Sequence, residues 1–309
     1  MTAATHLPGF DRTAVSLEPR TTANCLDVAA MFYGRHIADM LRAWAVVAAP
    51  TCAVVYGLAW RQGFDVRAAL VAVYVATLPE GVLVTLAVVP ALFGRRLSLV
   101  GGLANASGRL VGLLFKTAVV RTVAAVGPAL MLFSEEWLLG LVGFLLTLVP
   151  CGWLAARTGF LSERTALRSL DERLHDRRTD RLLGEQSGDL YSRACWILIY
   201  FVMLWAVVFV TVDFGWYLLA GDSPLVGRVL ELAESAATSG EVRQTFADVW
   251  HVLVHDAFLQ VELTATGLLA FPLTRLAWLF CYLDVRVRKD CWDMQLQFAD
   301  EVVRLEGRG

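Results

Sequence analysis

Six long apolar stretches, separated by polar segments, constrain this chain more than any other feature of its sequence. They cover residues 43–60, 66–93, 110–133, 137–156, 194–220 and 257–283. A helix of about 20 mainly apolar residues crosses the roughly 30 Å of hydrocarbon in a bilayer. The composition agrees, because 57% of the residues are hydrophobic, 18% are charged and the mean hydropathy is +0.57. We therefore expect an all-α, polytopic membrane helix bundle with about six transmembrane helices and additional amphipathic interfacial helices.

The Lys and Arg residues are distributed very unevenly among the polar segments. If the N-terminus faces the cytoplasm, the inside segments hold 20 of the 27 and the outside segments hold four. Cytoplasmic loops of membrane proteins are enriched in positive charge. The sequence therefore predicts a multi-pass protein of the bacterial cytoplasmic (inner) membrane with both termini in the cytoplasm. Anionic membrane lipids are sufficient partners for the basic segments, and we expect no nucleic acid as a partner.

The polar segments predict one membrane domain with few additions. Residues 1–19 have no hydrophobic period and predict a flexible N-terminal arm, whereas residues 20–309 predict a single six-span domain. This domain includes a cytoplasmic loop at 157–193, an acidic outer loop at 221–256 and a cytoplasmic tail at 284–309.

Two polar segments predict amphipathic helices. Apolar residues recur at helical spacing between Leu26 and Leu41, and Thr22 or Asn24 is the expected N-cap. This helix lies on the inner interface of the membrane or packs on the cytoplasmic loops. A second helix, from Ser162 to about Gly184, is a connector on the membrane surface or a docking surface for a partner.

Three ionisable residues inside the spans are candidates for function: Glu80, Lys116 and Arg121. With a rise of 1.5 Å per residue, Glu80 lies about 19 Å from the inner end of its span, Arg121 about 16 Å and Lys116 about 9 Å. Similar depth favours a pair between Glu80 and Arg121, whereas Lys116 can extend to the headgroups. Such a pair is a proton or ion relay or a lock between two helices, and Glu80 could also be protonated.

The third span also carries small residues spaced four apart, at Gly108 and Gly112. Small residues at this spacing let two membrane helices approach closely. We therefore expect a helix contact on this face.

Asp248, His251 and His255 are the candidate metal ligands, because they share one face of a helix in the outer loop. The pattern His-x-x-x-His alone is common, and the zincin motif needs a Glu where this chain has Val252. A stable site needs three or four well-placed ligands. We therefore expect no bound metal and no other cofactor, no motif identifies a catalytic residue, and we expect that the chain is not an enzyme.

The segment that follows the last span is rich in charge and ends in an aromatic anchor. If it is helical, acidic and basic residues alternate at i,i+4 spacing, and the basic ones lie where phosphate headgroups begin. We expect anchoring to lipid or to a protein partner through Asp284, Arg286, Arg288, Lys289 and Trp292.

Two segments resemble a known family. Residues 19–36 read PRTTANCLDVAAMFYGRH, and residues 282–293 read YLDVRVRKDCWD. They resemble the opening helix and the closing motif of bacterial polytopic proteins similar to the glycerophosphoryl diester phosphodiesterase membrane domain. The resemblance implies a membrane module that anchors or regulates another protein. The catalytic barrel needs on the order of 250 residues, and the polar segments here are too short to contain it.

The expected function is that of a non-enzymatic integral membrane scaffold or accessory subunit, with a cytoplasmic or membrane protein as its partner. The first alternative is a small-solute or lipid transporter that uses Glu80 and Arg121, and a remote alternative is a metal-dependent membrane enzyme. A transporter should have a polar cavity near Glu80, and an enzyme should have convergent ligands around His251 and His255.

Overall fold

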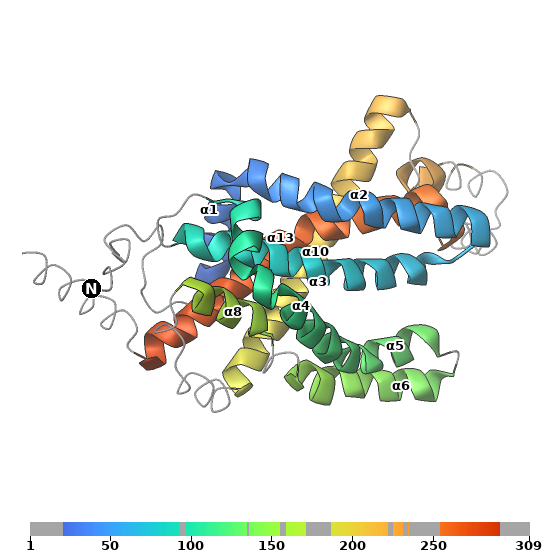
Figure 1. The fold of residues 1–309 in the computed structure, drawn as a ribbon. Helices are drawn as coiled ribbons and strands as arrows, with labels where there is room; N and C mark the ends of the chain where they lie inside the picture. Colours follow the sequence, from blue (N-terminus) through green and yellow to red (C-terminus); the bar gives the residue numbers. More distant parts are fainter. Residues whose placement is uncertain are drawn as a thin grey trace, which may run out of the picture. The chain divides into compact units, whose positions relative to one another are not determined.

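In the computed structural model, the described residues are 21–92, 97–134, 136–154, 159–170, 187–221, 225–230, 234 and 254–290. These ranges are almost entirely helical and contain no strand, which confirms the all-α prediction. Figure 1 shows the elements α1 (Thr22–Arg35), α2 (Ile37–Gln62), α3 (Val66–Leu92), α4 (Leu99–Ala124), α5 (Val126–Phe133), α6 (Trp137–Leu146), the π-helical turn η2 (Thr147–Cys151), α8 (Leu161–Leu170), α10 (Ser187–Ala220) and α13 (Ala257–Asp290).

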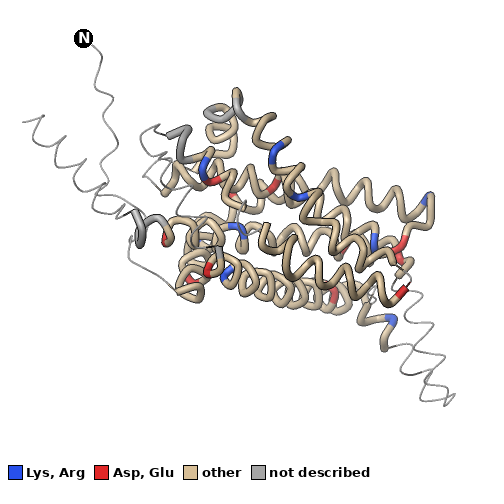
Figure 2. The backbone as a smooth tube through the Cα atoms, turned by 90° about the horizontal axis from the view of Figure 1, so that it is seen from below, with Lys and Arg blue, Asp and Glu red and all other residues tan. Residues whose placement is uncertain are grey.

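Among the described residues, five helices are long and apolar enough to cross a membrane. Leu110–Ala124 and Val126–Phe133 make a sixth crossing if this pair, bent by 49°, counts as one span. The bend has a local cause, because Pro128 has no N–H to donate to the carbonyl of Ala124. Figure 2 shows how few charged positions interrupt the helices. The predicted multi-pass helical architecture is confirmed, with spans at Ile37–Gln62, Val66–Leu92, Trp137–Leu154, Gly188–Ala220 and Ala257–Val285.

By its internal contacts the chain divides into two compact units. The first comprises Met1–Met40, Gly81–Leu198 and Leu273–Gly309, and the second comprises Leu41–Glu80 and Ile199–Pro272. The helices α2, α3, α10 and α13 contribute residues to both units. Whether residues 20–309 act as one membrane domain stays a prediction.

In the second unit, α2 and α10 both pack along α13. The indole of Trp44 on α2 donates to the carbonyl of Ala265 at 3.0 Å, and the rings of Tyr56 and Phe258 lie 5.7 Å apart. On α10, the indole of Trp205 donates to the carbonyl of Leu263 at 3.0 Å. A Cβ at Gly267 would lie 2.8 Å from that indole, so only glycine allows this close packing.

In the first unit, α1 packs on α13. Thr21 caps α1 by accepting a hydrogen bond from the backbone N–H of Asn24 at 3.3 Å, so the cap lies one residue before the earliest expected position. The buried face of α1 includes Phe32, whose ring lies 6.3 Å from that of Phe280. The structure thus places α1 against α13, and whether α1 also lies on the inner interface or on the cytoplasmic loops stays a prediction.

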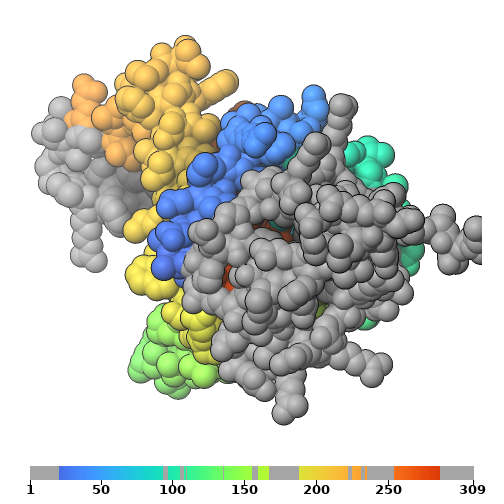
Figure 3. All heavy atoms as spheres, turned by 90° about the vertical axis from the view of Figure 1, so that its left-hand side faces the viewer, coloured from blue at the N-terminus to red at the C-terminus, as the bar shows by residue number. Residues whose placement is uncertain are grey.

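The helices α5 and α6 form a tight hairpin in the first unit. They lie side by side in Figure 1, and light-green atoms that follow α5 in the chain are visible at the lower left of Figure 3. A Cβ at Gly143 would lie 2.6 Å from the backbone N of Met131, and one at Gly127 would lie 2.6 Å from Thr147. The backbones of α5 and α6 therefore approach each other closely. The backbones of α3 and α4 do the same at Gly102, where a Cβ would lie 2.6 Å from the carbonyl O of Leu86.

The predicted contact at Gly108 and Gly112 is wrong for the described part of the chain. A Cβ at either position would have nothing within 4 Å, and both glycines are exposed. The physical reason is that small residues permit close packing without requiring it. The helix hairpin instead uses Gly127 and Gly143, which lie 16 positions apart on two helices.

A buried charged network on α13

Arg275 introduces a full positive charge into the apolar, membrane-spanning part of α13. It lies in the first unit, ten residues before the end of its membrane span at Val285, which is about 15 Å along the helix axis. A charged side chain at such a depth is costly unless it has a partner. Its side chain is 12% exposed, so that partner has to come from the protein.

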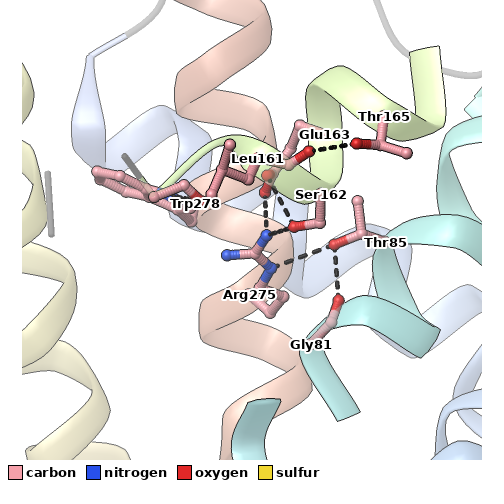
Figure 4. A network of polar contacts seen from close by, with 9 residues as sticks. Gly81, Thr85, Leu161, Ser162, Glu163, Thr165, Arg275 and Trp278 are labelled. Atoms are coloured by element: carbon pink, nitrogen blue, oxygen red, sulfur yellow. Dashed lines mark hydrogen bonds and ion pairs between the residues drawn. The ribbon is translucent and has the colours of Figure 1, made fainter. Parts of the chain in front are cut away.

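Three side chains from two other helices surround the guanidinium of Arg275 (Figure 4). Its Nε donates to the hydroxyl of Thr85 on α3 at 3.1 Å, and its Nη2 donates to the hydroxyl of Ser162 on α8. The same Nη2 lies 2.6 Å from Oε1 of Glu163, which is fully buried. Thr85 in turn donates to the carbonyl of Gly81 at 2.8 Å, and this bond fixes its hydroxyl for Arg275.

Aromatic packing holds α8 against α13 next to this network. The ring of Phe160 stacks on that of Trp278 at 4.5 Å between centroids and lies 4.8 Å from that of Tyr282. The indole N–H of Trp278 donates to the carbonyl of Gly159 at 3.3 Å. The residues before and in the first turn of α8 are therefore inserted against a membrane helix.

This arrangement involves the start of a segment for which the sequence predicted a helix. The helix predicted from Ser162 is present as far as Leu170, and residues 171–186 lie outside the described part. The start of this segment packs against the protein, because Phe160, Glu163 and Ala166 are buried. Whether the whole segment is a connector on the membrane surface or a docking surface stays a prediction.

Burial raises the pKa of Glu163 above its ordinary value. Removing the carboxylate from water disfavours its charged form, and the charge of Arg275 and the hydrogen bond from Ser162 at 3.0 Å oppose this only in part. Glu163 is therefore more easily protonated than an exposed glutamate.

A second ion pair joins α10 to α13 in the same unit. Arg193 contacts the buried carboxylate of Asp284 at 2.7 Å through Nη1. Its Nε also contacts Asp189, whose side chain is 55% exposed, at 3.1 Å. The sequence predicted that Asp284 helps to anchor the closing segment to lipid or to a protein partner, and the structure places its carboxylate on Arg193. The side chains of Arg286, Arg288 and Lys289, and all of Trp292, lie outside the described part.

The intramembrane candidates are placed as follows. Glu80 is fully buried, and neither of its carboxylate oxygens has a hydrogen-bond partner among the described residues. Lys116 is exposed and Arg121 is half-buried. Glu80 is assigned to the second unit, where it is the last residue of the segment Leu41–Glu80, and Arg121 is assigned to the first unit. The pairing of the two residues therefore stays a prediction.

The metal candidates are described only in part. His255 is exposed, whereas Asp248 and His251 lie outside the described ranges. Within those ranges, no three His, Cys, Asp or Glu side chains are placed so that they could share a metal ion.

Sequence reasoning missed the residues that make the charged network. Arg275 is recognisable as a charge inside a span, but its partner Glu163 is 112 positions away and lies in a loop with many charges of both signs. The available signal was the need of Arg275 for a counter-charge together with the aromatic residue Phe160 close to Glu163.

Comparison with known proteins adds no relative. No family model, no curated protein and no solved structure matches this chain. The resemblance to the glycerophosphoryl diester phosphodiesterase membrane domain therefore stays a prediction.

Proposed function

We propose that this chain is a non-enzymatic integral membrane protein that serves as a scaffold or accessory subunit of a membrane assembly. One observation supports the proposal: α1, α8 and the end of α13 pack into one ordered layer in the first unit. The contacts of Phe32 with Phe280, of Phe160 with Tyr282 and of Glu163 with Arg275 hold this layer together. A fixed surface of this kind suits the binding of another protein.

The surface offered to a partner is the outer face of α1. Asp27 and Arg35 are exposed on it, and Met31 is 75% exposed. An apolar side chain flanked by two opposite charges resembles the composition of protein interfaces, in which methionine is enriched. The resemblance of residues 19–36 to the opening helix of a membrane module supports the same region.

The proposed location is the bacterial cytoplasmic membrane, with this layer and both termini on the cytoplasmic side. The charge asymmetry of the loops supports it. Reporter fusions at Gly309 and near Ser187 test it. We expect both to be active only as cytoplasmic reporters, and a periplasmic signal at either site would overturn the orientation.

The scaffold function is tested by the size of the native complex. The tagged chain is expressed at its native level, extracted in mild detergent and compared by native mass with the purified chain alone. We expect a larger, stoichiometric complex. The double variant Asp27→Lys with Arg35→Glu should release the partner, because it reverses both charges beside Met31. Arg61→Glu, an exposed reversal at the end of α2, is the matched control and should retain it.

A native mass equal to that of the purified chain would contradict the scaffold function. So would a complex that survives the α1 variant and is lost in the control, since the partner would then bind elsewhere.

The transporter remains as a second candidate because of Glu80. A fully buried carboxyl group without a hydrogen-bond partner among the described residues is costly, and such groups in membrane helices often belong to proton or ion pathways. Proton uptake into liposomes containing the purified chain distinguishes the two functions. Uptake that is abolished by Glu80→Gln would favour transport.

A further inference from the structure

Among the described residues, Arg275 is bonded in its network through only two of its three nitrogens. Two of its nitrogens, Nε and Nη2, contact Thr85, Ser162 and Glu163. In Figure 4 no dashed line joins the third, Nη1, to any of the residues drawn, and this nitrogen points away from the labelled hydroxyl and carboxyl groups. A guanidinium can hold a planar anion through two parallel N–H donors, and here only one nitrogen faces the carboxylate.

The contact between Glu163 and Arg275 is likewise not an ideal ion pair. Its Oε1 lies 2.6 Å from Nη2, yet this oxygen receives no aligned hydrogen bond from the described residues. Its Oε2 accepts a hydrogen bond from Ser162 at 3.0 Å. Because Glu163 is attached to the first turn of α8, it cannot rotate its carboxylate freely onto both guanidinium nitrogens. An untethered anion would not have this restriction.

We propose that Arg275 is a binding site for a small monovalent anion and that the carboxylate of Glu163 is its internal occupant. Charge sets the valence, because Arg275 is the one cation that acts on Glu163 among the described residues. The size of the anion is limited to about that of the carboxyl group that it replaces. The site favours anions that lose their water easily, because Ser162, Glu163 and Thr85 are all buried. Weakly hydrated anions such as nitrate and bromide therefore fit better than sulfate.

Exchange of the occupant requires one proton. When the anion binds Arg275, the carboxylate of Glu163 takes up a proton from water and becomes neutral, so the network keeps its total charge. Ser162 on α8 and Arg275 on α13 contact Glu163, and Thr85 on α3 contacts Arg275; of these three residues only Arg275 is charged. The helix α4 also packs on α8, and none of its described side chains has an electrostatic effect on Glu163. This proposal is independent of the scaffold function.

The test uses the full chain in discs of zwitterionic lipid, which removes anionic headgroups as competitors. Thermal unfolding is followed while sodium nitrate replaces sodium gluconate at constant ionic strength. A ligand of the folded state raises the midpoint temperature. We expect nitrate to stabilise the wild type, with a half-effective concentration that falls as the pH is lowered. Glu163→Gln should bind nitrate about tenfold more tightly at neutral pH, which corresponds to about 1.4 kcal/mol, and should lose the pH dependence.

Three control variants complete the test. Glu163→Gln combined with Arg275→Gln removes both charges, so it should fold and show no response to nitrate. Lys116→Gln and Glu136→Gln remove one exposed charge of each sign and should respond like the wild type. A nitrate response in the double variant would overturn the site. No response in either the wild type or Glu163→Gln would also overturn it, and the ion pair would then be a structural lock alone. A second set of discs with anionic lipid should weaken the nitrate response only if headgroups compete for the same site.

Discussion

The hairpin of α5 and α6 depends on the absence of a side chain at Gly143, and Gly143→Ala measures this dependence. The added Cβ would lie 2.6 Å from the backbone N of Met131 and 2.8 Å from the carbonyl O of Gly127. Comfortable contacts are about 3.5–4.0 Å, so each overlap is about 1 Å. Both obstacles are backbone atoms, which cannot rotate away, so the two helices have to separate.

The expected loss of stability follows from two opposing effects. Overpacking of this kind costs about 3 kcal/mol, the upper end of the usual range, because neither helix can yield locally. Alanine also stabilises a helix by about 1 kcal/mol relative to glycine. The net loss for Gly143→Ala is therefore about 2 kcal/mol. Gly140→Ala is the matched control on the same helix, because the nearest atom to its Cβ would be Oγ of Ser134 at an ordinary 3.6 Å.

Unfolding in mixed micelles with a rising fraction of dodecyl sulfate, followed by circular dichroism, compares the two variants. We expect Gly140→Ala to equal or exceed the wild type and Gly143→Ala to unfold at a clearly lower dodecyl sulfate fraction. If both variants were equally stable, the helices would not be in contact at Gly143 and the reasoning would fail.

Three other predictions concern charged groups. Asp284→Asn should lower the free energy of unfolding by about 3 kcal/mol in the same assay, because it leaves the buried Arg193 without its counter-charge. Asp189→Asn should lower it by less than about 1 kcal/mol, because that carboxylate is exposed. Equal losses of stability would contradict the assigned geometry. Burial raises the pKa of Glu163, so the docking of α8 should be strongest at low pH and should weaken as the pH rises through that pKa. Hydrogen exchange of residues 161–170, corrected for the intrinsic pH dependence of exchange, measures this docking. The variant Glu163→Gln should abolish the trend. The pair expected between Glu80 and Arg121 should give a coupling free energy above about 1 kcal/mol in a double-mutant cycle of glutamine variants, and additive losses would reject it.

The membrane helices could be predicted from the sequence because hydropathy is a local property. Each span is recognisable within its own 20 to 30 residues, and the described helices coincide with the six apolar stretches. The helix that begins near Ser162 was also predictable, because its amphipathic period is local. The bend after Ala124 could have been anticipated from Pro128.

The charged network could not be predicted, because it depends on which helices meet. Arg275 had two kinds of candidate partner in the sequence, carboxylates within spans and carboxylates in loops, and depth arguments consider only the first kind. Glu163 became its partner because aromatic packing of Phe160 brings α8 against α13. Glycine spacing failed for a similar reason: the four-residue spacing of Gly108 and Gly112 predicts a contact, but only the neighbouring helix decides whether a glycine is packed, as Gly143 is.

The π-helical turn Thr147–Cys151 gives α6 an unusual tolerance to a change in chain length. A π turn accommodates one more residue than an α-helical turn while the flanking helices keep their alignment. On one side Gly143 is fixed against α5, and on the other Cys151 contacts the carbonyl of Val123 at 3.7 Å. Deleting Val149, which is 67% exposed, would remove the extra residue and leave both contacts in register, while Pro150 would still interrupt the helical hydrogen bonds there. A deletion anywhere in α3 would instead rotate every later side chain by about 100° and bring apolar groups to the wrong face.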